Sequence, residues 1–150
     1  MSFINPSQVF IGEKLDSRDA ALRFVSRKAA ELGFADSADI AYEAFLVREA
    51  EGATGLQWGF AIPHAKSEVI HKAGVIVLKM KEPVEWPSFD NQPVDIAIAL
   101  LVPDGQAGTT HLQLLSKTAL MLMDDDFRSF LRQNNDKAQI SAEMNKRLEA

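Results

Sequence analysis

The sequence predicts an α/β fold: one layered domain, residues 1–150, in which a small mixed β-sheet is flanked by helices. Three observations predict it. Residues 94–102 form an almost continuous apolar run, as in a central strand covered on both faces. Segments with helical spacing of apolar residues, bounded by caps and glycines, alternate with such runs. The length of 150 residues suits a single domain whose core needs neither disulfide nor metal.

The chain begins with a predicted strand and helix. Residues 8–11 alternate as a strand does, and Gly12 is expected to end it. The helix that follows is capped by Asp16 or Ser17 and ends where Gly33 adopts a left-handed conformation. Its core face is spaced at helical intervals: Ala21, Val25, Ala29 and Leu32.

A second helix is predicted for residues 37–51, with Gly52 as its stop. Arg48 then lies in its last turn. Taken alone, a cation there is explained by the helix dipole, or by pairing with Glu49 or Glu51. The apolar positions expected to face inward are Ile40, Ala44 and Val47.

The next segment, residues 60–63, leads to His64. Residues 60–62 predict a brief buried strand, and Pro63 fixes its own φ while keeping the preceding residue extended. His64 therefore leaves the core at a defined angle. Residues 65–72 are predicted to form a short helix or turn, with His71 in solvent.

Two longer strands follow. Residues 74–80 start a clear strand, and the pairs Glu82-Pro83 and Trp86-Pro87 predict turns or edge geometry beyond it. Residues 88–92 are expected to be a loop before the central strand of residues 94–102.

Three helices are predicted for the rest of the chain. The first is capped by Thr109 or Thr110, so His111 falls in its first turn. The second is capped within residues 124–126, and the third begins at about Ala138. The expected core positions are, in order, Leu112, Leu115, Ala119 and Leu122; Phe127, Phe130 and Leu131; and Ile140, Met144 and Leu148.

Composition excludes several classes of protein. A net charge of −5 argues against a nucleic-acid binder, which needs a basic face. No apolar run reaches the length of a membrane span, and the first residues lack the basic start and apolar core of a signal peptide, so we expect a cytoplasmic protein. The chain has no cysteine, which excludes disulfide and thiolate-metal chemistry.

His64 is the candidate reactive residue. A neutral imidazole is nucleophilic near neutral pH, although an ordinary histidine at the rim of the core is the alternative for a lone residue. Four short motifs in a fixed order decide between them: Arg48-Glu49, Thr54-Gly55, Ala61-Ile62-Pro63-His64 and His111-Leu112. This series resembles the enzyme IIA domain of the fructose/mannitol family of the bacterial phosphoenolpyruvate-dependent sugar phosphotransferase system, most closely the fructose-type members. The resemblance runs from about Val9 to the C-terminal helix.

The resemblance implies the same α/β fold and a phosphocarrier activity. The small carrier HPr would phosphorylate His64, which would pass the group to a cysteine of a sugar-specific IIB component and so, indirectly, serve the membrane component IIC. Arg48 and His111 would flank the phosphoryl group, and Thr54 would line the site. No metal or organic cofactor is implied. The sugar, the oligomeric state and the phosphorylated ring nitrogen of His64 stay open.

Two aromatic residues near the motif are candidates for an apolar docking surface, Trp58 and Phe60. Core packing explains Phe60 equally well. Trp58 stands where the family would have a smaller or polar residue, so details of partner contacts are not carried over.

Two other functions compete with sugar transport. A regulatory module of the nitrogen-related branch would share the fold and the histidine but control other proteins through its phosphorylation state. It ranks second because residues 81–86 and 111–117 look more like fructose-type proteins. A metal site is disfavoured because the spacing of the three histidines, His64, His71 and His111, matches no usual ligand pattern.

Overall fold

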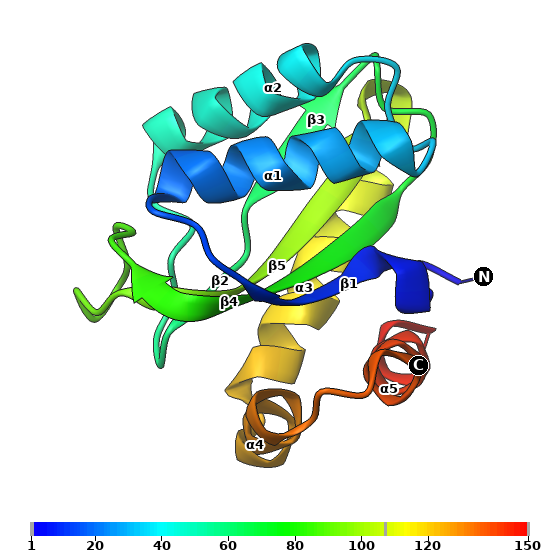
Figure 1. Cartoon of the computed structure of the whole chain (residues 1–150). Coiled ribbons are helices and arrows are strands. Elements are labelled where there is room, and N and C mark those ends of the chain that lie inside the picture. The colour runs from blue at the N-terminus through cyan, green and yellow to red at the C-terminus, as the bar shows by residue number, and fades with distance from the viewer. Residues whose placement is uncertain (1, 107, 150) are drawn as a thin grey trace.

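Figure 1 shows a computed structural model of the chain, which describes residues 2–106 and 108–149. The strands are β1 (Val9–Glu13), β2 (Phe60–Ala61), β3 (His64–Ser67), β4 (Gly74–Val84) and β5 (Val94–Pro103). The α-helices are α1 (Arg18–Glu31), α2 (Ala38–Glu51), α3 (Thr109–Met123), α4 (Asp125–Gln133) and α5 (Lys137–Glu149). Two short 3-10 helices, Pro6–Gln8 and Asp104–Gln106, precede β1 and α3.

The five described strands form one mixed sheet in the order β1-β4-β5-β2, and β3 also pairs with β5. The central pair, β4 and β5, is antiparallel, whereas β1 is parallel to β4, and both β2 and β3 are parallel to β5. β2 and β3 are thus two parts of one edge strand, interrupted at Ile62 and Pro63. His64 is the first residue after this interruption.

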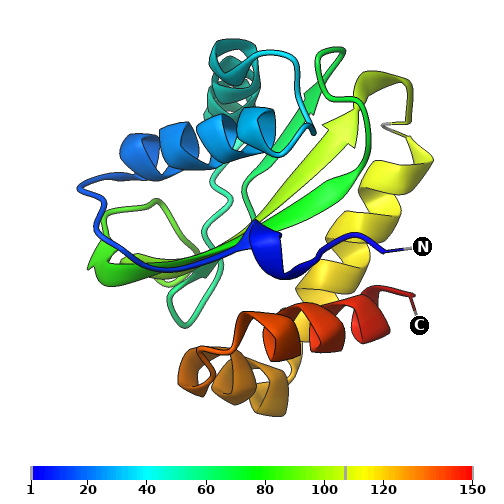
Figure 2. The ribbon, with the colours of Figure 1, turned by 45° about the vertical axis from the view of Figure 1, so that its right-hand side comes forward.

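Helices cover both faces of the sheet, as Figures 1 and 2 show. α1 and α2 lie on one face, and α3, α4 and α5 on the other. Alternate side chains of the central strands divide between the two cores: Ile76 and Leu78 join the first, and Val75 and Val77 the second. The predicted α/β fold with a mixed sheet and flanking helices is confirmed.

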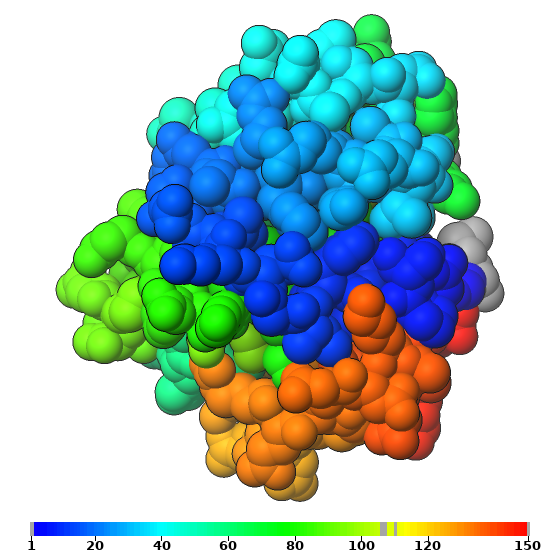
Figure 3. Space-filling view, viewed as in Figure 1, coloured from blue at the N-terminus to red at the C-terminus, as the bar shows by residue number. Residues whose placement is uncertain are grey.

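The N-terminal segment is held against α5, and the two ends of the chain border each other on the surface in Figure 3. The side-chain oxygen of Asn145 accepts hydrogen bonds from the backbone N–H groups of Phe3 at 3.0 Å and Ile4 at 3.2 Å. These bonds fix the start of the chain on the second core.

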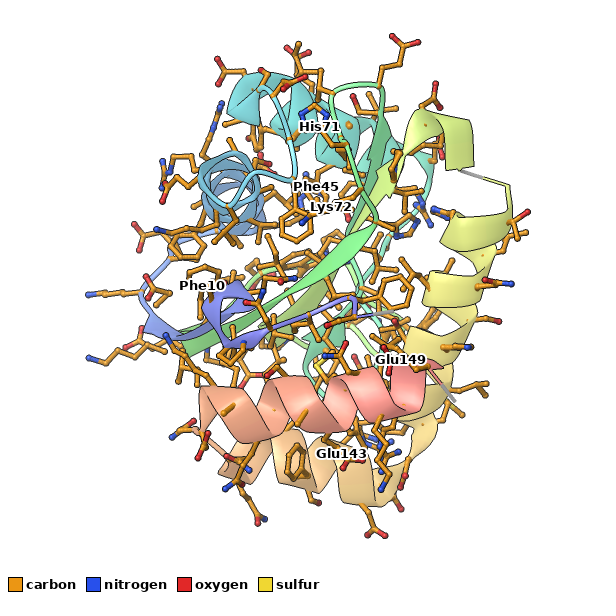
Figure 4. All side chains as sticks on the ribbon, turned by 90° about the vertical axis from the view of Figure 1, so that its right-hand side faces the viewer. Phe10, Phe45, His71, Lys72, Glu143 and Glu149 are labelled. Atoms are coloured by element: carbon orange, nitrogen blue, oxygen red, sulfur yellow. The ribbon has the colours of Figure 1, made fainter. Side chains whose placement is uncertain are left out.

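α2 packs with a different face from the one predicted. Ala41 and Phe45 are fully buried against α1 and the sheet, as Figure 4 shows for Phe45. Ile40 and Val47 are 46% and 62% exposed, so the prediction that they face inward is wrong. Both sets have helical spacing, and the larger aromatic side chain decides which one is buried. Ile40 and Val47 are left on the surface.

Three strands differ from their predictions. Residues 64–67 continue the edge strand as β3 instead of starting a helix or turn, because they pair with residues 100–103 of β5. β4 also runs past its predicted end, through Pro83 to Val84. Its pairing with β5 is interrupted between Lys79 and Val84, so Pro83 does not need a ladder N–H. β1 likewise continues past Gly12, with a register shift between Ile11 and Glu13.

The helices after β5 start as predicted, with differences at α3. The prediction that Thr109 or Thr110 caps α3 is wrong: Thr109 is the first residue of the helix, Gly108 takes the N-cap position, and no side chain caps it. Leu112 was expected in the core but is 63% exposed, and Leu114, Met121 and Leu122 are the apolar residues of α3 buried there. Phe130 is only partly buried, whereas the core positions of α5, Ile140, Met144 and Leu148, are confirmed. None of the described helices combines the length and apolarity that crossing a membrane requires.

Candidate active site

His64 lies at the bottom of a pocket of about 300 Å³ between the sheet edge and the ends of two helices. It is the first residue of β3, pairs with Leu100 of β5 and is only 4% exposed. α2 contributes one wall of the pocket, and the first turn of α3 contributes another. The lining residues are Ala44, Val47, Arg48, Glu51, His64, Lys66 and His111.

Hydrogen bonds define the tautomer of His64. Its Nδ1 lies 2.9 Å from the carbonyl oxygen of Ile62, which can only accept a hydrogen bond, so Nδ1 carries the proton. Its Nε2 accepts a hydrogen bond of 2.8 Å from Nε of Arg48. In the neutral ring, Nε2 is therefore the nitrogen with the free lone pair.

The end of α2 positions Arg48. Its Nε contacts His64, and its Nη1 donates to the carbonyl oxygen of Gly52 at 2.8 Å. Gly52 ends the helix with φ 155°, a conformation that side chains rarely adopt. The guanidinium is thus held by the helix end while it faces the imidazole.

His111 stands in the first turn of α3, as predicted, and its ring meets that of His64 edge-on. The centroids are 4.9 Å apart, and the ring planes are inclined by 64°. Nδ1 of His111 is buried and has no hydrogen-bond partner among the described residues. A buried N–H without an acceptor is more costly than a bare lone pair, so the proton is expected on Nε2. The pKa of His111 is lowered by burial and by Lys66 and Arg48.

Burial and neighbouring charges keep His64 neutral. Burial is the main cause that lowers its pKa from 6.5 to about 4. The positive charge of Arg48 acts in the same direction, and so does His111 whenever its ring is protonated. The Ile62 carbonyl and Glu51 oppose the shift. Near pH 7 the imidazole is consequently unprotonated and nucleophilic.

The structure brings together three of the four residues predicted at the site, Arg48, His64 and His111. The fourth, Thr54, is buried behind the pocket and does not line it. Its hydroxyl donates to a carboxylate oxygen of Glu49 and accepts a bond of 3.3 Å from the indole N–H of Trp86.

Sequence reasoning missed Lys66 as a lining residue. The local pattern predicts a helix or turn there, whereas β3 places Lys66 two residues after His64, on the same side of the strand. A period of two, read from the histidine onward, would have indicated it. Glu51 also lines the pocket, whereas the sequence indicates it only as a partner of Arg48.

The other aromatic and histidine residues lie elsewhere. Phe60 is 1% exposed and belongs to the core. Trp58 is 47% exposed and borders a separate apolar pocket with Phe89 and Met123. His71 is exposed, as predicted, near the top of Figure 4, and its Nε2 lies 2.6 Å from a carboxylate oxygen of Asp36. Within residues 2–106 and 108–149, no group of three or more His, Cys, Asp or Glu residues is arranged to hold a metal ion.

The chain is similar to known proteins over most of its length. The chain is 35% identical to a nitrogen regulatory protein of Bradyrhizobium diazoefficiens over 89% of its own length and 86% of the relative's. It is 32% identical to the fructose-specific EIIA component of the sugar phosphotransferase system of Haloferax volcanii, over 91% and 89% of the two chains.

Solved structures have the same fold. The nitrogen regulatory protein IIA-Ntr of Neisseria meningitidis superimposes with a TM-score of 0.85 and 26% identity, covering 93% of this chain and 94% of that one. Enzyme IIA-Mtl of Escherichia coli, in its complex with phosphorylated enzyme IIB-Mtl, superimposes with a TM-score of 0.77 and 19% identity, covering 95% and 99%.

The family model described as "Phosphoenolpyruvate-dependent sugar phosphotransferase system, EIIA 2" matches residues 2–147. The chain therefore belongs to the EIIA 2 family of the phosphoenolpyruvate-dependent sugar phosphotransferase system.

Proposed function

We propose that the chain is a phosphocarrier that accepts a phosphoryl group on Nε2 of His64 and passes it to a second protein. One observation carries the proposal: a neutral imidazole presents the lone pair of Nε2 to a pocket that also holds a guanidinium and a second imidazole. Phosphoryl transfer depends on positioning and on charge stabilisation, and this pocket supplies both.

The transfer step needs no metal and no proton relay. Nε2 of His64 attacks phosphorus in line, the N–P bond of the donor phosphohistidine breaks, and its electron pair stays on the donor nitrogen. The new phosphoimidazole keeps its proton on Nδ1 and so carries positive charge in the ring. The Ile62 carbonyl, 2.9 Å from Nδ1, stabilises that charge. In the second transfer, a thiolate of the acceptor attacks the phosphorus in line, an S–P bond forms, and the N–P bond breaks. The electron pair of that bond returns to Nε2 of His64.

The cations around His64 would hold the phosphoryl oxygens. Nε of Arg48 now occupies the lone pair of Nε2 and has to turn aside as phosphorus approaches. From there the guanidinium can bind the equatorial oxygens, together with the Nε2–H of His111 and the ammonium group of Lys66, which lines the same pocket. We assign Thr54 to this site as a support behind the pocket.

The donor in this proposal is HPr, and the acceptor is a cysteine of a IIB component, with the membrane component IIC served indirectly. The chain contains no cysteine, so a thiolate acceptor has to be on another protein. The structure of IIA-Mtl with phosphorylated IIB-Mtl supports such a pairing through a shared fold.

Exposed apolar side chains on the two helices that line the pocket fit the docking of these partners, and they are called the apolar rim below. Val47 and Ile40 on α2 and Leu112 on α3 are 62%, 46% and 63% exposed. Val47 lines the pocket, and Leu112 follows His111 in the chain. Large apolar side chains are seldom left exposed together on a surface that binds nothing.

Sugar transport, with fructose as the preferred substrate, and nitrogen-type regulation use the same chemistry. The Haloferax volcanii relative supports the first, and the Bradyrhizobium diazoefficiens and Neisseria meningitidis proteins support the second. In the regulatory case the phosphate would add negative charge beside the apolar rim and so change which protein binds there.

The test is phosphorylation by phosphoenolpyruvate, enzyme I and HPr, followed by two measurements. Coupling between ³¹P and ¹⁵N in the ring of His64 should assign the phosphate to Nε2. A chase with fructose-type IIB components should then empty the histidine if the chain serves transport. Phosphate on Nδ1 would contradict the mechanism, and a stable phosphohistidine in the presence of every such IIB would favour regulation.

A further inference from the structure

Glu49 is a buried carboxylate next to Arg48 that does not point into the pocket. Its side chain is only 1% exposed. One oxygen accepts the hydrogen bond from the Thr54 hydroxyl, and the other lies 3.4 Å from the backbone nitrogen of Thr54 and 3.9 Å from Nη1 of Arg18. A buried carboxylate is costly unless hydrogen bonds compensate it, so its partners are part of a defined arrangement.

Thr54 links Glu49 to the segment that carries the histidine. Its hydroxyl is held between Glu49 and the indole N–H of Trp86. Its carbonyl oxygen accepts a hydrogen bond of 3.0 Å from the backbone N–H of Ile62. The carbonyl of Ile62 in turn accepts the Nδ1 hydrogen bond of His64. An unbroken series of contacts therefore connects Glu49, through Thr54 and Ile62, to the imidazole.

The bond from Ile62 to Thr54 lies at the interruption of the edge strand. Phe60 and Ala61 are paired with β5, and pairing resumes at His64. Between them, Pro63 has no N–H to donate, and its carbonyl accepts a bond of 2.9 Å from Leu100. The Thr54 carbonyl thus fixes the peptide unit before the Ile62 carbonyl, and the bond from Leu100 fixes the one after it, so the two bonds together limit the direction of that carbonyl.

We propose that Glu49 is a positioning residue: by holding Thr54 in place, it keeps the Ile62 carbonyl directed at Nδ1 of His64 and so keeps the lone pair on Nε2. If that bond were lost, the proton would be free to move to Nε2, and a ring with Nε2–H cannot attack phosphorus. A triad aspartate that fixes the tautomer of a catalytic histidine acts by the same logic. The consequence for transfer rests on the proposed function, but the tautomer does not.

Glu49 acts here through hydrogen bonds and not through its charge. The side chains whose charges influence the pKa of His64 are Arg48, Glu51 and, when it is protonated, His111. A side chain of the same length that still accepts a hydrogen bond should therefore preserve much of the effect. This separates Glu49→Gln, which retains an acceptor oxygen for Thr54, from Glu49→Leu, which does not.

The experiment measures the tautomer of His64 from the ¹⁵N chemical shifts of its ring at neutral pH in the full-length chain. The natural protein, Glu49→Gln and Thr54→Ser should show a protonated Nδ1 and an unprotonated Nε2. Glu49→Leu and Thr54→Val should show the two tautomers in exchange. Thr118→Val is the matched control, because Thr118 is fully buried and its hydroxyl has no partner among the described residues.

A second readout is the single-turnover rate at which phospho-HPr phosphorylates His64. Glu49→Leu and Thr54→Val should be phosphorylated more slowly by roughly tenfold. This is the lower end of the loss seen when a residue that orients a metal ligand is removed. Glu49→Gln and Thr118→Val should stay near the natural rate. Urea unfolding shows which variants are folded. Should Glu49→Leu fail to fold, Thr54→Val decides, since valine has the shape of threonine.

A folded Glu49→Leu or Thr54→Val with the natural tautomer and rate would overturn the role of Glu49. Absence of phosphorylation in every chain, the natural one included, would instead overturn the proposed function. The ring shifts would still decide whether Glu49 positions the imidazole.

Discussion

Acidification is expected to destabilise the protein through His64. The folded state keeps this imidazole neutral until its pKa of about 4, whereas the unfolded chain protonates near the ordinary value of 6.5. Between those values the unfolded state binds more protons, so stability present above pH 6.5 is lost as the pH falls towards 4. With about 1.4 kcal/mol for each pKa unit, His64 alone should remove about 2 kcal/mol by about pH 5 and about 3 kcal/mol once the pH is below its folded pKa.

The assay is urea unfolding of the natural chain and of His64→Gln at about pH 7.5 and about pH 5. Other titrating groups are present in both chains and largely cancel in the difference. The natural chain should lose about 2 kcal/mol more than the variant over this range. A parallel NMR titration, with the His64 ring signals assigned by their absence from the variant, gives the pKa directly.

Equal losses of stability in the two chains would refute the reasoning, as would a His64 signal that titrates with a midpoint near 6.5. Either result would mean that the imidazole is accessible to water and not held neutral by burial. The lone pair of Nε2 would then be available at pH 7 only in part, and the phosphoryl transfer rate would follow that titration.

Three further predictions concern other parts of the molecule. Arg48→Ala should slow phosphorylation of His64 by about 10²–10³-fold. Arg48→Lys should not restore the rate, because an ammonium group lacks the rigid planar set of N–H donors of a guanidinium. Single-turnover labelling measures both variants. Val47→Asp and Leu112→Asp should raise the KM for phospho-HPr with little change in unfolding free energy. Leu120→Asp should leave KM unchanged, because Leu120 is similarly exposed but lies about two turns further along α3 from His111, which lines the pocket. Lys79→Met should cost about 2–3 kcal/mol in urea unfolding, since the buried Nζ donates to the carbonyls of Leu131 and Asn134; a loss below about 1 kcal/mol would contradict that role.

The parts of the fold that could be predicted from sequence are those with one possible arrangement. The run of residues 94–102 is apolar throughout and had to be a covered strand, now β5. Ile140, Met144 and Leu148 offer α5 a single apolar face, and that face is buried. Pro63 restricts the chain before His64, and the histidine does emerge at an interruption of the edge strand.

The errors arose where two arrangements fit the local pattern equally well. In α2, Ile40 and Val47 compete with Ala41 and Phe45, and only packing against the sheet selects the second pair. The residues after His64 are polar enough for a turn, but pairing with β5 makes them a strand, which is a contact distant in sequence. Such long-range contacts are invisible in a local pattern.

The site was predictable as a set of residues and less so as an arrangement. The family resemblance that the motifs carry implied Arg48, His64 and His111, which the structure brings together. Nothing in the sequence indicated that the Thr54 hydroxyl bonds Glu49, because a threonine beside a glycine is ordinary turn chemistry. The predicted contact of Thr54 with the phosphoryl group stays a prediction.

The central claim is that His64 carries the phosphoryl group. The most direct measurement is intact mass after incubation of the natural chain and of His64→Ala with phosphoenolpyruvate, enzyme I and HPr. The account predicts one acid-labile phosphate on the natural chain and none on the variant. An unmodified natural chain, or an equal phosphate on His64→Ala, would contradict it.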